Sequence, residues 1–234
     1  MKIDVVIDTT CPWCFIGKKR LELLIANEHN LNFEINWQPY ILNPEILPKG
    51  MDSEENLYKN SGGKTKYQKS NNTINQLAKN LNIEFNFSKI KRIPNTIDSH
   101  RMIKLASHQN MSTEMLESIF QNYFSMGNDI GNRSVLINIG TELGFARTKL
   151  KEYLNSDEDT SEILRQSQRI FHSGISGIPT FIFNEDLSIS GIQDIRILRR
   201  LINIAEQDIN SLVNKAHQSI IEKFKQDEID YESK

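Results

Sequence analysis

The spacing of apolar positions along the chain changes twice, and its first part predicts a strand, a helix and a second strand. Residues 2–8 are rich in β-branched apolar side chains, which is typical of a largely buried strand. Residues 12–29 carry apolar positions at helical spacing, so they predict a helix. Residues 31–37 alternate between apolar and polar side chains, which predicts a half-buried strand.

From about residue 53 to residue 171 the apolar spacing is helical throughout. The pattern predicts a series of helices over residues 64–81, 97–109, 112–126, 133–143 and 148–154, with a last one that opens at residues 156–157. After Gly174 the pattern returns to short β-rich runs over residues 180–183 and 187–190, separated by a polar turn, which predicts a hairpin. Asp194 then caps a helix through residue 204, and helical spacing continues beyond it.

This order of elements predicts an α/β chain with a thioredoxin-like fold and a large all-helical insertion between strand 2 and the strand that begins after Pro179. The core comes in two parts, residues 1–50 and 173–206. Residues 51–172 form the predicted helical insertion domain, and residues 207–234 form a helical C-terminal tail with a charged end.

Composition and charge narrow the class of protein. The 234 residues are 38% hydrophobic and 25% charged, which describes an ordinary globular chain with a substantial core. The net charge of −2 gives no electrostatic basis for binding nucleic acid or an anionic membrane. No run of about 18 apolar residues occurs and no signal peptide is visible, so we expect a cytoplasmic protein without a membrane partner.

The two cysteines of the chain, Cys11 and Cys14, lie three positions apart just after the first predicted strand. A Cys-x-x-Cys motif in this position indicates a redox pair. Pro12 suits the first position of a helix, which makes Cys11 the N-cap residue. Free N–H groups and the helix dipole then favour a thiolate at Cys11, and we expect the basic residues 18–20 to add positive potential. Cys14, one turn further on, is the predicted resolving thiol.

Three other interpretations of the cysteines are weaker. A structural disulfide between them would close only a very small loop and would constrain little. A structural zinc site needs four ligands, but the chain has no second cysteine pair and its five histidines show no paired spacing, so we predict no metal site. Two unrelated core cysteines that happen to be neighbours remain as the third alternative.

The segment of residues 176–181, Ser-Gly-Ile-Pro-Thr-Phe, leads into the first strand of the predicted hairpin. Proline removes a ladder donor and so belongs at the start of a strand, and X-Pro bonds are where cis peptides occur. A cis bond at Pro179 would leave the backbone of Ile178 exposed, where an extended substrate segment can pair with it. An ordinary turn is the alternative.

These segments together resemble a known family. Residues 8–18 (Asp-Thr-Thr-Cys-Pro-Trp-Cys-Phe-Ile-Gly-Lys) are similar to the active-site stretch of DsbA-family thioredoxin-fold oxidoreductases, above all their FrnE-like branch. Residues 175–181 resemble the cis-proline loop of that branch, and further matches lie at residues 95–101, 127–131 and 190–193. The resemblance spans about residues 3–205 and implies a thiol–disulfide oxidoreductase with Cys11 as nucleophile, Cys14 as resolving thiol and Pro179 in the cis form.

Several residues around the pair are candidates for binding substrate: Ile178, Trp13, Pro12, His100 and Asn95. Trp13 is either a stacking surface for substrate or a residue that lies over the helix start. His100 and Asn95 either look onto the cysteines from the helical insertion or are a helix-surface histidine and a capping asparagine.

The buried acid of thioredoxins lies six residues before the first cysteine, and Val5 occupies that position here. Asp8 is nearer to the pair, but we expect it in the loop, so the proton acceptor for Cys14 has no assignment. The pair encloses Pro-Trp with no histidine to stabilise the Cys11 thiolate, so strongly oxidising behaviour is not assumed.

The sequence therefore predicts a cytoplasmic dithiol–disulfide oxidoreductase that acts on disulfide- or thiol-containing proteins or small molecules. It needs no bound cofactor, but an external reductant or oxidant must reset the pair, with glutathione as a possible co-substrate. The main alternative is a glutathione-dependent isomerase or transferase of the kappa or 2-hydroxychromene-2-carboxylate isomerase type, which typically carries serine in place of Cys11. A chaperone without redox turnover is a further alternative. The direction of electron flow and the choice between monomer and homodimer stay open.

Overall fold

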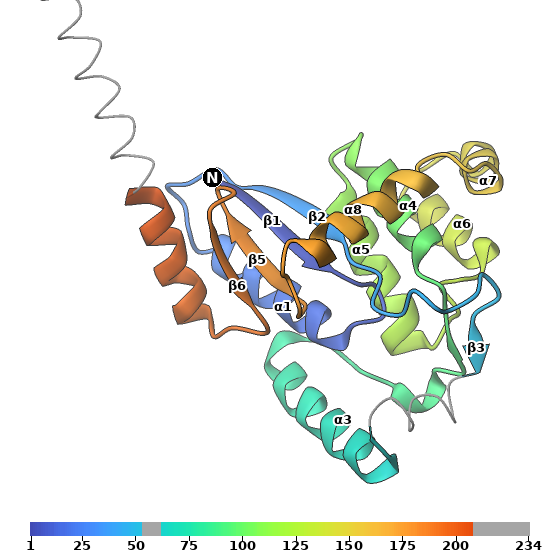
Figure 1. The fold of residues 1–234 in the computed structure, drawn as a ribbon, viewed down its shortest axis with the longest axis horizontal. Helices are drawn as coiled ribbons and strands as arrows, with labels where there is room; N and C mark the ends of the chain where they lie inside the picture. The colour runs from blue at the N-terminus through green and yellow to red at the C-terminus, as the bar shows by residue number, and fades with distance from the viewer. Residues whose placement is uncertain (53–61, 208–234) are drawn as a thin grey trace, which may run out of the picture.

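The structure is a computed structural model that describes residues 1–52 and 62–207 (Figure 1). The start of the predicted insertion, residues 53–61, and the predicted tail beyond residue 207 lie outside the described residues. Within the described part, none of the helices combines the length and the apolar character needed to cross a membrane.

A four-stranded sheet forms the centre of the molecule, with strand order β2-β1-β5-β6. Its strands are β1 (Lys2–Ile7), β2 (Glu34–Pro39), β5 (Thr180–Phe183) and β6 (Leu187–Ser190). β2 runs parallel to β1, while β5 is antiparallel to both β1 and β6. Because β1 lies inside the sheet with both faces covered, its residues 3–7 are all buried, which explains its continuous apolar run.

Helix α1 (Pro12–Ile25) connects β1 to β2, as parallel neighbouring strands require a crossover. The predicted strand–helix–strand unit and the predicted hairpin are therefore present. The chain enters the insertion after β2 and returns to the sheet at β5, which confirms the predicted fold class.

Most of the insertion is helical. Its helices are α3 (Lys64–Ala78), α4 (Ile97–Ser107), α5 (Ser112–Phe120), α6 (Arg133–Glu142), α7 (Arg147–Asn155) and α8 (Thr160–His172), with short 3-10 turns η1 (Lys79–Leu81) and η2 (Phe87–Lys89) and a π-helical turn η3 (Gln121–Met126). In one detail the all-helical prediction needs correction. Two short strands, β3 (Met51–Asp52) and β4 (Arg92–Ile93), form a small antiparallel sheet. Such short pairings carry no periodic signal in the sequence.

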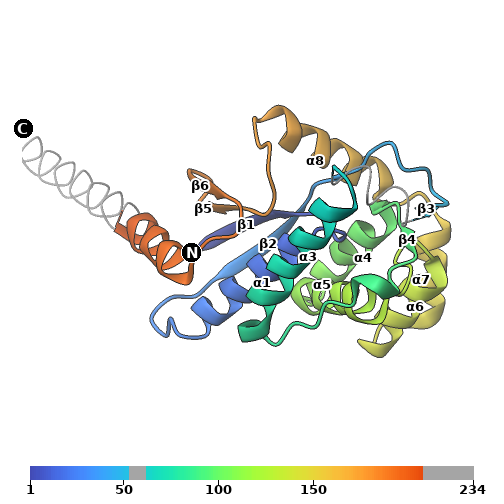
Figure 2. The same ribbon diagram turned by 90° about the horizontal axis from the view of Figure 1, so that it is seen from below.

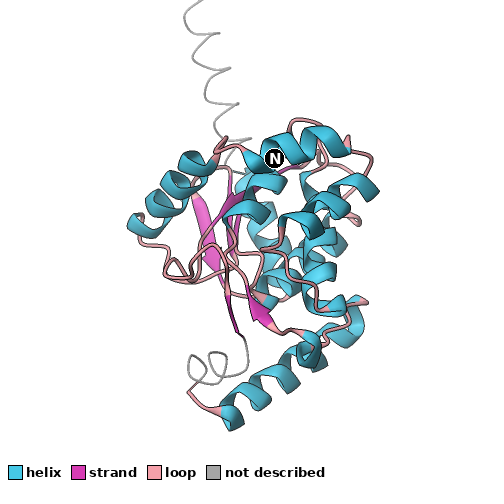
Figure 3. Ribbon diagram, turned by 90° about the vertical axis from the view of Figure 1, so that its right-hand side faces the viewer, coloured by secondary structure: helices cyan, strands magenta, loops and turns pink. Residues whose placement is uncertain are grey.

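The insertion packs against the sheet and against α1. Helices α5 and α8 contact β2 (Figure 1), and α3 lies beside α1 (Figure 2). Helices lie on both sides of the strands in the view of Figure 3. A cluster of phenylalanines joins the two parts, because Phe15 on α1 stacks on Phe120 of α5 with ring centroids 4.8 Å apart. One continuous core therefore holds the insertion and the sheet together.

Candidate active site

Cys11 is the N-cap residue of α1, with the extended backbone conformation that this position favours. Pro12 occupies the first turn, where a missing N–H leaves no bond unmade. The N–H of Cys14 donates to Sγ of Cys11 over 3.3 Å, so the open end of the helix points at this sulfur. The local geometry matches the helix start predicted from the sequence.

Cys14 lies one turn into the helix and is completely shielded from solvent, and both cysteines are free thiols. Burial raises the pKa of the Cys14 thiol well above that of a free cysteine, and its hydrogen bond with Cys11 raises that pKa further. Cys14 therefore holds its proton near neutral pH. Both cysteines are buried, Cys11 with 3% of its surface exposed at the start of the helix and Cys14 with none.

The loop before β5 completes the immediate surroundings of Cys11. The Ile178–Pro179 peptide bond is cis, the geometry that the resemblance implies. The thiol of Cys11 donates a long, weak hydrogen bond to the carbonyl oxygen of Ile178, with Sγ and the oxygen 4.0 Å apart. Segments 167 positions apart in the chain thus meet at one sulfur.

The approach of this loop to α1 depends on Gly17. A Cβ atom at this position would come within 2.8 Å of Cγ of Pro179 and 3.1 Å of the Phe181 ring. Only a residue without a side chain lets the helix and the loop pack so closely. Gly17 belongs to the stretch that carries the family resemblance, and the contact gives it a physical role.

Asp8 is a buried carboxylate directly before the cysteine loop, with 1% of its surface exposed. Its Oδ1 accepts hydrogen bonds from the N–H and the hydroxyl of Thr10, both over 2.7 Å. Its Oδ2 accepts from the N–H of Leu42 over 2.8 Å and from the hydroxyl of Thr96 over 3.2 Å. Sequence reasoning placed Asp8 in the loop but missed this network. An aspartate that can bond the backbone two positions on is an available signal for such a turn.

The start of α4 holds the loop that carries Cys11. Besides the bond from Thr96 to Asp8, the hydroxyls of Thr9 and Ser99 lie 2.7 Å apart in a buried hydrogen bond. Ser99 also bonds the carbonyl oxygen of Thr96 over 2.8 Å. The insertion therefore holds the loop that carries Cys11 through side chains about ninety positions away in the chain.

Asn95, a predicted substrate-binding residue, makes structural hydrogen bonds. Its amide nitrogen donates to the carbonyl oxygen of Ile46 over 2.7 Å, and its amide oxygen accepts from the N–H of Ile97 over 3.0 Å. These bonds correspond to the alternative of a capping asparagine at the start of α4.

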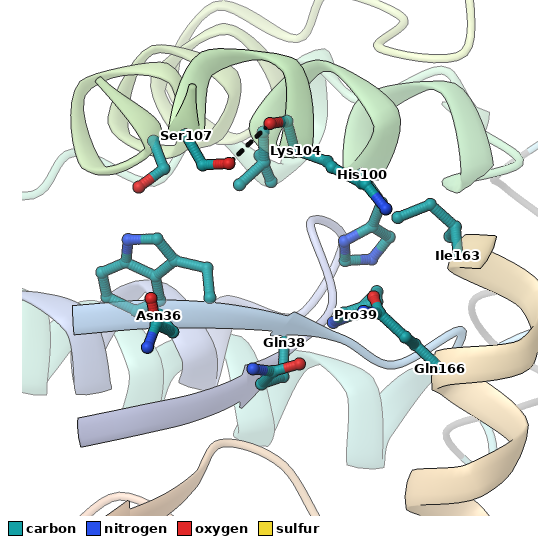
Figure 4. Close-up of a pocket in the computed structure, with 11 residues that line it drawn as sticks. Asn36, Gln38, Pro39, His100, Lys104, Ser107, Ile163 and Gln166 are labelled. Carbon is teal, nitrogen blue, oxygen red and sulfur yellow. Dashed lines mark hydrogen bonds between the residues drawn. The ribbon is translucent and has the colours of Figure 1, made fainter. Parts of the chain in front are cut away.

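His100 is buried within α4 rather than lying on its surface. Burial lowers the pKa of its ring, although the charge of Asp8 and a hydrogen bond with the Tyr40 backbone act in the opposite direction. The ring extends from α4 toward β2 near Pro39 (Figure 4). His100 therefore lines a pocket different from the one that Pro12 and Trp13 line.

Pro12 and Trp13 form one wall of a pocket of about 180 Å³ next to the cysteines. Other walls come from Tyr67 on α3 and from Tyr123 and Phe124 on η3. Tyr123 and Phe124 are both buried. They also contribute to this pocket, which the α3 helix of the insertion brings beside the two cysteines.

Two of the three basic residues expected to add positive potential, Lys18 and Lys19, are paired with carboxylates, whereas Arg20 donates to the carbonyl oxygen of Gln193. Lys18 is 1% exposed and forms ion pairs with Glu22 and Glu117. Lys19 also pairs with Glu117, over 2.7 Å. These carboxylates offset the two ammonium charges, and the start of the helix contributes a positive end directly at Cys11.

Comparisons with known proteins agree with this geometry. The model of the DsbA-like thioredoxin domain family matches residues 2–203. The chain is 26% identical over 189 residues to the uncharacterized protein YwbO of Bacillus subtilis strain 168, covering 78% of this chain and 86% of that protein.

Two solved structures share the fold. A probable DsbA oxidoreductase, SCO1869 of Streptomyces coelicolor, aligns with a TM-score of 0.81 at 18% identity over 88% of this chain and 90% of that one. The cytosolic disulfide reductase DsbM of Pseudomonas aeruginosa, solved with glutathione, aligns with a TM-score of 0.58 at 16% identity over 91% and 99%.

The chain belongs to the DsbA-like thioredoxin domain family. The predicted class, a thiol–disulfide oxidoreductase, is confirmed at that level. Enzymes of this class act on thiol or disulfide substrates.

Proposed function

We propose that this chain exchanges disulfides through the pair Cys11 and Cys14, with Cys11 as the attacking sulfur. The observation that carries this assignment is the position of the Cys11 sulfur. It accepts the Cys14 N–H at the start of α1 and lies 4.0 Å from the carbonyl oxygen of Ile178. A sulfur at a helix N-terminus gains stabilisation as a thiolate, the form that attacks disulfides.

In the reducing direction, the Cys11 thiolate attacks one sulfur of a substrate disulfide. A Cys11–substrate disulfide forms, and the other substrate sulfur leaves as a thiolate that takes a proton. Cys14 then loses its proton and attacks Cys11, which releases the second substrate sulfur and leaves a Cys11–Cys14 disulfide. Two electrons pass from the pair to the substrate, and the oxidising direction is the reverse.

The high pKa of Cys14 fits the resolving role in this sequence. A buried, protonated thiol does not compete with Cys11 for the substrate. Asp8 is the carboxylate whose charge acts on Cys14, but four donors already bind its oxygens. We therefore assign Asp8 to holding the loop rather than to taking the proton of Cys14.

For substrate binding, we propose the backbone of Ile178 and the pocket beside Trp13. Strand β5 begins at Thr180, so Ile178 lies just outside the sheet pairing, where an extended substrate segment can add hydrogen bonds. The pocket of about 180 Å³ lined by Pro12, Trp13 and Tyr123 is suited to an apolar group next to the substrate sulfur.

We further propose that the enzyme acts in the cytoplasm and that an external thiol such as glutathione resets the pair. DsbM, which shares the fold, is a cytosolic disulfide reductase solved with glutathione, and this supports the proposal. No bound cofactor enters the exchange chemistry, because both electrons reside on the two sulfurs. The resemblance to the FrnE-like branch rests on the motifs around Cys11 and Pro179.

Two matched variants and one potential test this function. Cys11→Ser should abolish reduction of a model protein disulfide, and Cys14→Ser should accumulate mixed disulfides detectable by mass spectrometry. The reduction potential of the Cys11–Cys14 pair distinguishes the two directions of electron flow. A value near the roughly −270 mV of thioredoxin indicates a reductase, and a value near the roughly −120 mV of DsbA indicates an oxidant. Full activity of Cys11→Ser would refute the assignment.

The glutathione-dependent isomerase is distinguished by the same variants. Such an enzyme needs one activated position to hold or activate glutathione, and Cys14 would be dispensable. Turnover of an aromatic substrate with glutathione that survives in Cys14→Ser would favour the isomerase over the oxidoreductase.

A further inference from the structure

The end of β6 lies beside the loop that leads into β5, and the two strands run next to each other in Figure 1. Ser190, the last residue of β6, pairs with Thr180, the first residue of β5. The N–H of Gly191 then donates to the carbonyl oxygen of Pro179 over 2.7 Å. The end of β6 therefore contacts the two residues that follow Ile178, whose backbone we propose to bind substrate.

Two hydroxyl groups connect the strands at this point. The Thr180 hydroxyl donates to the carbonyl oxygen of Gly177 over 2.6 Å, and its oxygen lies 2.7 Å from the hydroxyl oxygen of Ser190. A hydroxyl has a single hydrogen to donate. Because the hydrogen of Thr180 is used toward Gly177, the Ser190 hydroxyl is the donor in the second bond. Two consecutive hydrogen bonds, which we call the hydroxyl chain, therefore run from Ser190 through Thr180 to the Gly177 carbonyl.

The hydroxyl chain fixes the direction of the Ile178 N–H. The carbonyl of Gly177 and the N–H of Ile178 belong to one planar trans peptide group, so they point in opposite directions. A bond that holds the carbonyl therefore also orients the N–H. Because glycine has wide backbone freedom, an anchor at Gly177 removes more conformations than it would at another residue. Thr180 is 1% exposed, so water has little access to the hydroxyl that supplies the anchor.

The segment after β6 is also tied to helix α1. The guanidinium of Arg20 on α1 donates to the carbonyl oxygen of Gln193 over 2.7 Å. The side-chain amide of Gln193 donates in turn to the carbonyl oxygen of Ser190 over 2.7 Å. The helix of the attacking sulfur and the loop of Ile178 are therefore connected through residues 190–193, a segment that matches the family motifs but has no part in the exchange chemistry.

We propose that Thr180 and Ser190 are positioning residues for polypeptide substrates. Through the hydroxyl chain they aim the Ile178 N–H at a carbonyl oxygen of an extended substrate segment, while the substrate sulfur lies at Cys11. This inference rests on the proposed exchange function, because it needs the disulfide to react at Cys11. A disulfide without amide groups cannot use the Ile178 N–H in this way. The hydroxyl chain should therefore favour disulfides within a polypeptide over small organic disulfides.

Two disulfides separate this role from a general structural one. The first joins two copies of the capped peptide Ala-Ser-Cys-Ser-Ala, and the second is bis(2-hydroxyethyl) disulfide, which has no amide group. The pre-reduced protein is mixed with an excess of each, and the second-order rate constant is measured by stopped flow. In Thr180→Val the ratio of the peptide rate constant to the small-disulfide rate constant should fall about tenfold, as expected for one lost hydrogen bond. Thr180→Ser keeps the hydroxyl, so its ratio should stay within about twofold of the wild-type value.

A matched pair of variants on β6 gives a second measurement that leaves the buried threonine in place. Ser190→Ala removes the first donor of the hydroxyl chain, whereas Ser188→Ala makes the same change at an exposed residue that pairs with Ile182. We expect the ratio of rate constants to fall about threefold in Ser190→Ala and to stay unchanged in Ser188→Ala. An equal loss with both disulfides, or an unchanged ratio in Thr180→Val and Ser190→Ala, would overturn the positioning role. Wild-type protein that reacts with neither disulfide would instead refute the exchange function on which the inference rests.

Discussion

Gly17 and Pro179 approach each other so closely that a Cβ atom on the glycine would lie 2.8 Å from Cγ of the proline. The contact joins the helix that begins at Cys11 to the loop that carries Ile178. It therefore controls the spacing between the Cys11 sulfur and the Ile178 carbonyl oxygen, which are 4.0 Å apart.

Replacing Gly17 by alanine should lower both stability and exchange rate. Alanine favours a helix interior by about 1 kcal/mol over glycine, but overpacking a buried contact costs about 1–3 kcal/mol. The clash is with two ring side chains, so we expect a net loss in the free energy of unfolding, measured by urea denaturation. Gly177→Ala is the control, since a Cβ there meets nothing within 4 Å. A Gly17→Ala protein as stable as the wild type would contradict the role of this contact.

Removing the hydroxyl of Thr96 should loosen the loop before Cys11. Thr96→Val deletes one of the four hydrogen bonds to the buried Asp8 carboxylate, and a hydrogen bond to a charged group contributes about 1.5–3 kcal/mol. We expect a loss of about that size in unfolding free energy and slower thiol exchange. Thr141→Val, whose hydroxyl bonds only within its own helix α6, should have a smaller effect on stability and none on exchange. Equal effects of the two variants on stability and on thiol exchange would show that the hydrogen bond from Thr96 to Asp8 does not hold the loop.

Because the ammonium group of Lys18 is buried, we expect Glu117→Gln and Lys18→Met to change the free energy of unfolding by different amounts. Glu117→Gln leaves this charge with Glu22 as its remaining partner, and a buried charge left wholly unpaired costs about 3–5 kcal/mol, so we expect a loss of about 2–3 kcal/mol. Lys18→Met removes the charge itself, and the change should stay within about 1 kcal/mol. Urea denaturation of both variants measures the contrast. A larger loss of unfolding free energy in Lys18→Met than in Glu117→Gln would contradict this prediction.

The ion pairs of Glu117 with Lys18 and Lys19 predict that the free energy of unfolding depends on pH in the acidic range. Burial alone would raise the pKa of Glu117, but Lys18 and Lys19 lower it below its ordinary 4.5. The stabilisation is therefore fully present above pH 4.5 and is lost as the pH falls through the lower folded-state value. The difference in unfolding free energy between wild type and Glu117→Gln should shrink in that window.

His100 predicts a second pH dependence, at less acidic pH. Burial lowers its pKa below the ordinary 6.5, so in the window under pH 6.5 the unfolded chain binds a proton that the folded chain does not. Stability should fall as the pH drops from 6.5 toward the folded-state value. Thermal unfolding of wild type and His100→Gln across this range measures the contribution. A wild-type curve that runs parallel to that of the variant would exclude it.

The sequence predicted the helix start at the two cysteines well because its signals are local. Two cysteines three apart, with Pro12 between them, define a helix start without reference to the rest of the chain. The hairpin over residues 180–183 and 187–190 was likewise placed at its observed bounds, since turn residues separate two short β-rich runs. Element ends were less accurate: α1 stops at Ile25 rather than at residue 29, and β2 begins at Glu34 rather than at residue 31.

The properties of a residue that depend on partners far away in the chain could not be predicted from the sequence. Lys18 looked like a source of positive potential because its neutralising partner, Glu117, lies 99 positions away on α5. Asp8 looked like an ordinary loop residue because its burial depends on Thr96 and Leu42. Such contacts follow from how the insertion packs on the sheet, and no short window of sequence contains that information.

The hydrogen bond between Thr9 and Ser99 joins two parts of the chain that are synthesised at different times. Both cysteines lie within the first fifty residues and are therefore synthesised early. The side chains that hydrogen-bond their loop belong to the start of α4 and are synthesised later. Pairing across ninety positions is slow compared with local helix formation. The nascent chain therefore carries two thiols before it carries an enzyme, and docking of the insertion marks the change from one to the other.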